Sequence, residues 1–288
     1  MKWMMTRFRS KMRALIDADI LRYEVGFAAE AGWKFHNGVA SLPPFDYVEN
    51  ILLQRINILM LDMKADEYTL YITEGPTFRE KIATLKPYKG TRPSNKPWHF
   101  TNLTVYLTDV LGANVITGIE ADDALAVEHI KGGDTTLCSR DKDLRQVPGR
   151  FYSWELGKQP AYGPVDIDIV GNLKLSDNRK KLSGSGYAFF CAQVLMGDAV
   201  DNIPGLPGCG PSKTFNVLKA ITEYEYDPEF KSVKQDCEDL FERVEHEYFL
   251  HYGNDYYDYL LEQGRLCWMS RKLYEDGSPV LWEIGMWE

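Results

Sequence analysis

Acidic side chains follow most of the apolar, β-forming runs in the first half of the chain. Asp17 closes the run RALID, and the runs near residues 74, 120 and 141 end in the same way. Parallel strands of one sheet end at a common edge, where open α/β sheets bind ligands, so we expect these carboxylates to gather there. Asp198 and Asp201, three residues apart at the end of a predicted helix, can project from one face and join them. The acidic set comprises Asp17, Asp19, Glu74, Glu120, Asp122, Asp123, Asp141, Asp143, Asp198 and Asp201.

Crowded carboxylates need cations. Two unit charges about 4 Å apart repel by roughly 4 kcal/mol at an effective dielectric near 20. Several such pairs would consume most of a typical domain stability of about 5–15 kcal/mol. Oxygen ligands with no nearby His or Cys indicate Mg²⁺ or Mn²⁺ rather than zinc. Two such ions, about 3.5–4 Å apart, suit in-line cleavage of a phosphodiester.

Each acidic residue also has an ordinary structural interpretation. A lone Asp after a strand is usually a turn former or a helix N-cap. Asp122 and Asp123 could simply favour the positive end of a helix, and Asp141 could cap a turn. Asp19 could reach a metal through water or point away as a turn residue. The whole set, rather than any one member, favours a metal site.

The stretch GDAVDNIPGLPGCGPSK, residues 197–213, joins two of these aspartates to a glycine-rich turn. Glycines let the backbone turn tightly and approach a phosphate closely. Free N–H groups at the start of the following predicted helix, with Ser212 and Lys213, can bind a phosphate. Such a turn can also merely connect two helices. Beside Asp198 and Asp201, it suggests that the aspartates hold cations at a scissile phosphate while the turn holds another phosphate along the duplex.

The composition is that of a globular protein with an uneven charge distribution. Hydrophobic residues make up 44% and charged residues 26% of the chain, and no apolar run reaches the roughly 18 residues of a membrane span. The basic start MKWMMTRFRSKMR lacks the apolar region of a signal peptide. Five scattered cysteines without a CxxC pair indicate reduced thiols in a cytoplasm.

The net charge of −9 hides a local basic segment. Residues 222–288 contain 17 acidic and 6 basic residues, whereas residues 1–221 contain 25 acidic and 27 basic residues. Within 79–96, six Lys or Arg accompany one Glu, which is typical of a docking surface for an anion. The acidic stretch 223–247 is interpreted as a solvated helical face or a protein-docking surface.

The order of the runs predicts an α/β fold. β-forming runs alternate with helical spacing, which indicates a mostly parallel twisted sheet flanked by helices. From about residue 184 the β-forming runs fade and helical segments follow. We predict an α/β core over 1–183, including a basic segment at 79–100, and a helical region over 184–288. The predicted strands lie within 13–19, 67–75, 113–123, 134–143 and 149–154, and the predicted helices within 47–63, 101–112, 187–198 and 212–221.

Several motifs, in order along residues 14–221, resemble those of the flap endonuclease and 5′–3′ exonuclease superfamily. LIDADIL is similar to its first metal-ligand motif, GIEADDALA to its central acidic motif, and SRDKDLRQV to its strand-end Asp-x-Asp. FREKIATLKPYKGTR resembles the basic segment that leads into its helical arch, and residues 197–213 resemble its helix–three-turn–helix. The ending is similar to the tail of phage exonucleases. The resemblance implies a PIN-like nuclease core followed by a duplex-binding helical region.

The resemblance also implies roles for individual residues. Lys89 and Arg92 would bind the scissile phosphate and, with Asp17 and Asp141, carry catalysis. Tyr88 would stack on a base, and Arg79 would contact a further phosphate. Two Mg²⁺ or Mn²⁺ ions would be held by Asp17, Glu74, Glu120, Asp122, Asp123, Asp141, Asp143, Asp198 and Asp201. The duplex backbone would be held by Gly205, Gly208, Gly210, Ser212 and Lys213, with a bound K⁺ ion as in relatives.

The implied function is a divalent-metal-dependent, structure-specific 5′ nuclease, either a 5′–3′ exonuclease or a flap endonuclease. We expect a monomer acting on double-stranded or branched DNA with 5′ ends, or on RNA–DNA hybrids. The tail suggests phage DNA replication, degradation or primer removal in a bacterial cytoplasm, with no membrane partner. Glu74 departs from the family's usual Asp, Gln193 stands where some phage relatives carry Lys, and PSNKPWHF is a short segment for an arch.

Three alternatives differ in class. The first is a catalytically silent DNA-binding protein with the same fold. The second is a PIN-type ribonuclease that acts on single strands. The third is a phosphatase that uses Asp17 and Asp19 as a nucleophile pair, which leaves residues 197–213 without a role.

Overall fold

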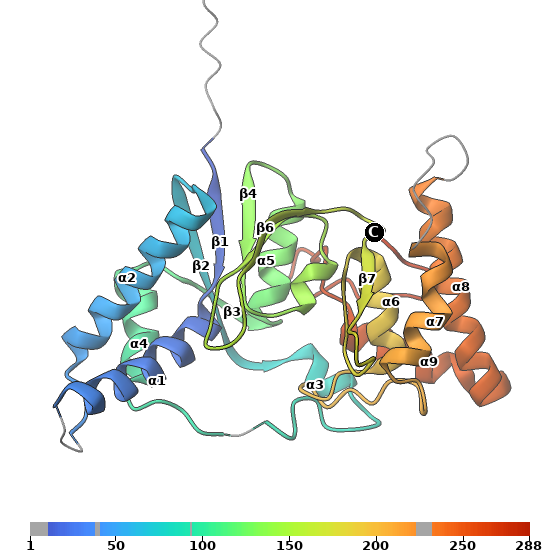
Figure 1. The fold of residues 1–288 in the computed structure, drawn as a ribbon, viewed down its shortest axis with the longest axis horizontal. Coiled ribbons are helices and arrows are strands. Elements are labelled where there is room, and N and C mark those ends of the chain that lie inside the picture. Colours follow the sequence, from blue (N-terminus) through green and yellow to red (C-terminus); the bar gives the residue numbers. More distant parts are fainter. Residues whose placement is uncertain (1–10, 38–40, 93, 223–231) are drawn as a thin grey trace, which may run out of the picture.

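A six-stranded sheet forms the centre of the first part of the chain (Figure 1). The computed structural model describes residues 11–37, 41–92, 94–222 and 232–288. Residues 1–10 of the basic N-terminal start and residues 223–231 of the acidic stretch lie outside these ranges. The strand order is β3-β2-β1-β4-β5-β6, and every neighbouring pair is parallel except β5 and β6. The strands are β1 (Arg13–Asp17), β2 (Glu67–Thr77), β3 (Asn114–Gly118), β4 (Thr135–Cys138), β5 (Gly149–Ser153) and β6 (Tyr162–Ile167).

The predicted α/β fold is therefore confirmed. Four of its five parallel strands lie within a predicted run, and β2 extends two residues beyond the run 67–75. The sheet separates two hydrophobic cores because successive side chains of a strand point to opposite faces. Ala14 and Ile16 of β1 pack with the helices of one face, whereas Leu15 packs with α5 (Ala121–Ile130) on the other face. The first face carries α1 (Ala18–Asn37), α2 (Phe45–Met63) and α4 (Phe100–Val105), which continues as a π-helical turn (Tyr106–Val110), and the second carries α5 (Ala121–Ile130).

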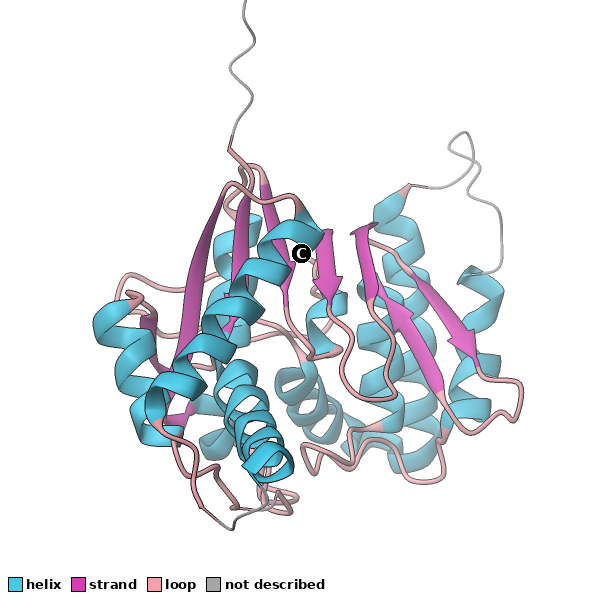
Figure 2. Cartoon of the chain, turned by 60° about the vertical axis from the view of Figure 1, so that its left-hand side comes forward, coloured by secondary structure: helices cyan, strands magenta, loops and turns pink. Residues whose placement is uncertain are grey.

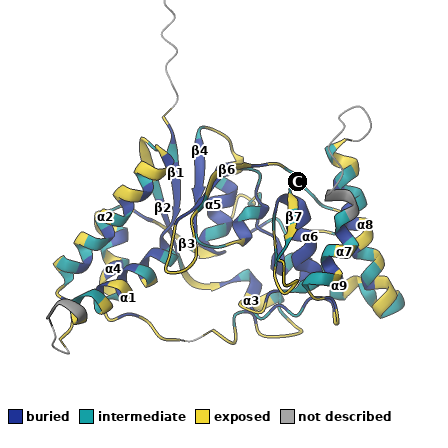
Figure 3. Cartoon of the chain, viewed as in Figure 1, coloured by how far each residue is buried: buried dark blue, intermediate teal, exposed yellow. Residues whose placement is uncertain are grey.

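The later part of the chain is mainly helical and surrounds a third core. Helix α6 (Gly186–Met196) is buried over nearly its whole length, which is why its sequence is apolar on all sides (Figure 3). Around it pack α7 (Pro211–Thr222), α8 (Val233–Tyr252) and α9 (Tyr256–Cys267). The described part of the acidic stretch belongs to α8, whose apolar face includes Leu240 and Val244 in this core.

Three strands were not predicted. β6 closes the edge of the sheet antiparallel to β5. An antiparallel hairpin of β7 (Asn172–Leu175) and β8 (Leu182–Ser185) lies beside the C-terminal helices (Figure 2). All five cysteines are free and buried. Among the described helices, none has both the length and the apolarity that a membrane span requires.

Candidate active site

Aspartates lie at the carboxyl edge of the parallel strands. Asp17 is the last residue of β1; its Oδ2 accepts a hydrogen bond from Ser139 Oγ at 2.8 Å, and its Oδ1 accepts one from the Asp19 backbone N–H at 3.0 Å. Asp122 lies in the first turn of α5, and Asp141 follows β4. Because these strands are parallel and adjacent, residues far apart in the sequence reach one edge.

Burial and mutual repulsion raise the pKa values of these carboxyl groups. Burial, then the charges of Asp19 and Asp141, raise the pKa of Asp17 to about 7. Burial, then Asp17 and Asp141, raise the pKa of Asp122 well above its ordinary value. Burial, then Asp141, raise the pKa of Asp143 to about 7, and the pKa of Asp141 itself is raised mainly by burial. The cluster is therefore short of positive charge.

Three basic side chains contact the outer carboxylates of this cluster. The Lys89 ammonium is paired with Glu120 Oε1, and the Arg92 guanidinium with Asp201 Oδ1. The Lys142 ammonium lies between Asp143 Oδ1, at 3.0 Å, and Asp198 Oδ2. Because of these contacts, the pKa of Asp198 is below its ordinary value, although burial acts in the opposite direction.

The segment that carries Lys89 and Arg92 is anchored to the loop after α6. The Lys89 backbone N–H donates to the Asp201 carbonyl at 2.8 Å, and Asn202 Nδ2 donates to the Pro87 carbonyl at 2.8 Å. Lys89 has a left-handed backbone with φ 53°. These hydrogen bonds join two segments that are far apart in the sequence, and both basic side chains then face the carboxylates.

Tyr88 does not fit the predicted role of a base-stacking residue. Only 7% of it is exposed, and its hydroxyl lies 2.8 Å from Glu120 Oε2 and 3.0 Å from Asp201 Oδ2. Its ring belongs to the core of the helical part. The buried ring has no free face to offer a base, so the stacking prediction is wrong for this conformation, and Tyr88 instead links the two carboxylates.

Arg79 and Asp123 form a buried structural pair. Arg79 is fully buried, and both Nη atoms bond to Asp123, at 2.5 and 2.8 Å. All five N–H donors of Arg79 are used, because the others reach Glu120, the Leu266 carbonyl and the Trp268 carbonyl. Asp123 also accepts from the Ser270 backbone N–H at 2.9 Å. The predicted phosphate contact of Arg79 and metal ligation by Asp123 are therefore wrong, since neither group has a free donor or acceptor face.

Asp19 lies beside Asp17, where its charge adds to burial in raising the pKa of that residue, whereas Glu74 makes no contact with the cluster among the described residues. Asp19 pairs with Arg22 and accepts hydrogen bonds from the Thr73 backbone N–H at 3.1 Å and from Thr73 Oγ1 at 2.5 Å, so it supports the middle of β2. Glu74 is exposed, and no hydrogen bond or ion pair connects it to the described residues. Metal ligation by Glu74 stays a prediction.

The glycine-rich turn has a buried half and an open half. Gly205 has φ +63°, and a Cβ there would lie 2.2 Å from the backbone nitrogen of Gly197. Its buried N–H donates to Gln263 Oε1 at 2.8 Å, so the predicted phosphate contact of Gly205 is wrong. Gly205 instead allows two backbone segments to touch and thereby sets the position of Asp198 and Asp201.

The open half of the turn leads into α7. Gly208 and Gly210 are exposed, with open space where a side chain would stand. Ser212 Oγ accepts from Arg179 Nε and Nη2 at 2.9 and 2.7 Å, and Lys213 pairs with Glu247 at 2.7 Å. These side chains lie at the first turn of α7, whose free N–H groups favour an anion.

Comparisons with known proteins show a similar fold and partial sequence matches. The flap endonuclease of bacteriophage T5, solved in a complex with DNA and metal ions, is similar with a TM-score of 0.50 at 16% identity, over 88% of this chain and 99% of that one. The chain thus has the fold of this flap endonuclease. DNA polymerase I of Rhizobium leguminosarum is 31% identical over 127 residues, and the flap endonuclease Xni of Shewanella halifaxensis is 26% identical over 169.

These matches are partial. They cover 41% and 56% of this chain, and the chain covers 11% and 62% of the two relatives. No family model matches the chain.

The site is chemically suited to the divalent cations that the 5′ nuclease fold implies. Asp122 Oδ1 is buried and has no hydrogen-bond partner among the described residues, and the pKa values of four carboxyl groups are raised. Hard oxygen donors of this kind suit Mg²⁺ or Mn²⁺. Within the described ranges, no three acidic, His or Cys side chains converge as ready-made ligands. Lys89, Arg92 and Lys142 hold the outer carboxylates instead.

Sequence reasoning missed Lys142 and Ser139, and it noted Gln193 without assigning it a contact. Lys142 lies inside the Asp-x-Asp motif, and its basic charge beside two aspartates was the available signal. Ser139 orients Asp17, and Gln193 Nε2 donates to Asp143 Oδ1 at 2.6 Å. Gln193 thus contacts the cluster with a neutral amide, at the position where some phage relatives carry Lys.

Proposed function

We propose that the chain is a divalent-cation-dependent, structure-specific 5′ nuclease that hydrolyses DNA phosphodiesters. The observation that carries this proposal is the group of carboxyl groups with raised pKa values beside Lys89 and Arg92 at the carboxyl edge of the sheet. The partial matches to flap endonucleases and 5′–3′ exonucleases support it. RNA–DNA hybrids and a role in phage replication or primer removal belong to the same proposal.

The carboxylates would hold the cations, and Lys89 and Arg92 would bind the substrate. A pair of bound divalent ions would supply a nucleophile at neutral pH and offset charge on the phosphate. When cations neutralise Glu120 and Asp201, the basic side chains paired with them become available for the scissile phosphate. Tyr88 and the Lys89 backbone keep this segment in place. The proposed cation ligands are Asp17, Glu74, Glu120, Asp122, Asp141, Asp143, Asp198 and Asp201.

The open half of the glycine-rich turn would hold the duplex away from the cleaved bond. Gly208 and Gly210 leave room for a phosphate, and Ser212 and Lys213 supply donors. A K⁺ ion bound at this turn is part of the proposal. Contacts of this kind reach the backbone and no base edge, so we expect selectivity for structure rather than sequence. Binding should weaken steeply with added salt.

The proposal is tested by cleavage of 5′-labelled blunt, nicked, flapped and RNA-primed duplexes with Mg²⁺ or with chelator. The Asp141→Asn variant should cut more than about 100-fold more slowly, because it loses a charged cation ligand. It should still bind duplex DNA in chelator. Asp276→Asn, an exposed residue of the C-terminal segment, should cut at the wild-type rate.

Undiminished cleavage by Asp141→Asn would refute the assigned site. A wild-type chain that binds duplex DNA but takes up no Mn²⁺ in calorimetry would be a silent DNA-binding protein. Preferential cleavage of single-stranded RNA would instead support a PIN-type ribonuclease.

A further inference from the structure

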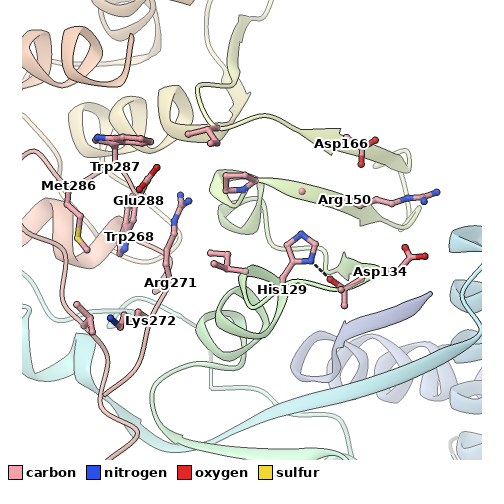
Figure 4. A pocket seen from close by; sticks show the side chains of 17 residues that line it. His129, Asp134, Arg150, Asp166, Trp268, Arg271, Lys272, Met286, Trp287 and Glu288 are labelled. Carbon is pink, nitrogen blue, oxygen red and sulfur yellow. Dashed lines mark hydrogen bonds between the residues drawn. The ribbon is translucent and has the colours of Figure 1, made fainter. Parts of the chain in front are cut away.

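A cavity of about 790 Å³ lies on the opposite edge of the sheet from the carboxylate cluster. It is bounded by the residues that precede β4 and β5 and by the C-terminal segment. Figure 4 shows Arg271, Trp268, Trp287 and Glu288 on one side and His129, Arg150 and Asp166 on the other. Its size is within the range of about 300–1,000 Å³ that is usual for small-molecule sites. Nothing in the proposed nuclease chemistry uses it.

Arg271 is a half-buried cation that forms no ion pair in the described part of the chain, and the charge of Glu288, which lines the same cavity, acts on it. Its Nη2 donates to the Gln146 carbonyl at 3.0 Å, and its guanidinium stacks 4.4 Å from the centre of the Trp268 ring. Its Nε is buried and makes no hydrogen bond to the described residues. Burial lowers the pKa of Arg271 to about 10, so the group is still charged at neutral pH. Arg79 shows the contrast, because all of its donors are satisfied.

The other lining groups add hydrogen-bond donors and a flat apolar surface. Trp268 Nε1 is buried and has no acceptor among the described residues. Trp287 is half-buried, and Lys272 is exposed at the rim. Arg150 lies opposite Asp166 in the register of β5 and β6. Arg271 thus offers an unsatisfied donor to the cavity, and Trp287 offers an aromatic ring.

We propose that this cavity binds a nucleoside 5′-monophosphate, with the phosphate at Arg271 and the base against Trp287. A guanidinium fork suits phosphate oxygens, and an indole suits a base by stacking. Trp268 is already covered by Arg271 but can donate its indole N–H to the ligand. The choice of a nucleotide among anions that carry a ring rests on the proposed function, since a 5′–3′ exonuclease releases such products. Binding itself requires no cleavage.

The test is calorimetric titration with dAMP in the presence of chelator, using the full chain. Wild type should bind one dAMP, and tryptophan fluorescence should change. Arg271→Gln should weaken binding at least about tenfold, because it removes a charge-assisted contact. Lys89→Ala/Arg92→Ala should bind as wild type does, because those residues belong to the opposite edge. Trp287→Ala is the second variant; it should weaken dAMP binding and reduce the fluorescence change.

Each outcome decides the matter. Absence of binding by wild type at millimolar dAMP overturns the proposal, as does binding that survives both cavity variants. Loss in the Lys89/Arg92 double variant alone would place the ligand in the catalytic site. If inorganic phosphate binds as tightly as dAMP, the base makes no contribution to binding, and the proposed contact between the base and Trp287 is wrong. Since no cation or cleavage is involved, the result does not depend on whether the chain is a nuclease.

Discussion

At the scale of single residues, the basic segment combines two different roles. Lys89 and Arg92 remain partly accessible beside the carboxylates, whereas Arg79 is enclosed. The positions of the aspartates could be predicted, because a residue that ends a parallel strand must lie at the sheet edge. The burial of Arg79 could not, because its partners are 41 to 189 residues away in the sequence. A run of basic residues gives no signal of which member turns inward.

Arg79→Met should destabilise the fold rather than selectively weaken DNA binding. It leaves Asp123 buried without its partner, which costs about 3–5 kcal/mol. The free energy of unfolding in urea measures the effect. Lys81→Met, an exposed neighbour in the same short helix (α3, Phe78–Ile82), should stay within about 0.5 kcal/mol of wild type. A soluble Arg79→Met protein of wild-type stability would contradict the role assigned to this guanidinium.

At the scale of elements, prediction succeeded where a pattern was long and regular. Four of the five parallel strands come from predicted runs with acidic residues at or just after their ends, and the helical period over 47–63 matches α2. β6 contains a Gly-Pro pair, and β7 and β8 have only four residues each, so no period could develop. The glycine-rich turn was correctly placed before a helix, but its sequence could not show that only its second half is open.

The two halves of that turn should respond differently to alanine. Both Gly205 and Gly208 have positive φ, so either substitution costs about 1–2 kcal/mol of backbone strain. Only at Gly205 would the new methyl group meet backbone atoms, so Gly205→Ala should cost about 1–3 kcal/mol more. Thermal or urea unfolding of the two variants measures the difference. Equal losses of stability would contradict the close contact of Gly205 with Gly197.

At the scale of the whole molecule, the carboxylate cluster connects the α/β part to the helical part. Asp17, Asp122 and Asp141 come from the sheet region, and Asp198 and Asp201 from the loop after α6. Mutual repulsion in this cluster should therefore weaken the entire fold when no cation is bound. The family resemblance indicated which parts meet, whereas the pairing of Lys142 with Asp143 and Asp198 required the structure.

The stability of the metal-free chain should depend on pH through these groups. Asp17 and Asp143 have pKa values raised from 3.8 to about 7. Between these two pH values the folded state therefore binds more protons than the unfolded state. Their contribution to stability therefore falls as pH rises from about 4 to 7. Asp198, whose pKa is lowered, loses its contribution only below that window. His129 acts in the opposite direction, because burial lowers its pKa.

Asp122→Asn isolates the carboxyl contribution. In chelator at pH 7.5, this variant should be more stable than wild type by on the order of 1 kcal/mol, and the gain should shrink at pH 5. Mg²⁺ should stabilise wild type more than the variant. Urea unfolding at both pH values, with and without Mg²⁺, gives these numbers. A variant less stable than wild type under every condition would show that the cluster carries no electrostatic strain.

The hydrogen bonds that Arg79 and Asp123 make to the C-terminal segment have a consequence for engineering the chain. Its guanidinium reaches the carbonyls of Leu266 and Trp268, while its partner Asp123 accepts from the Ser270 backbone. The last stretch of the polypeptide is thereby joined to the α/β part through its own main-chain groups, which no side-chain substitution in that stretch removes. A shortened chain that stops before residue 266 would leave the buried Arg79 guanidinium with fewer hydrogen-bond acceptors. Truncation there should therefore destabilise the fold far more than the irregular secondary structure of that stretch suggests.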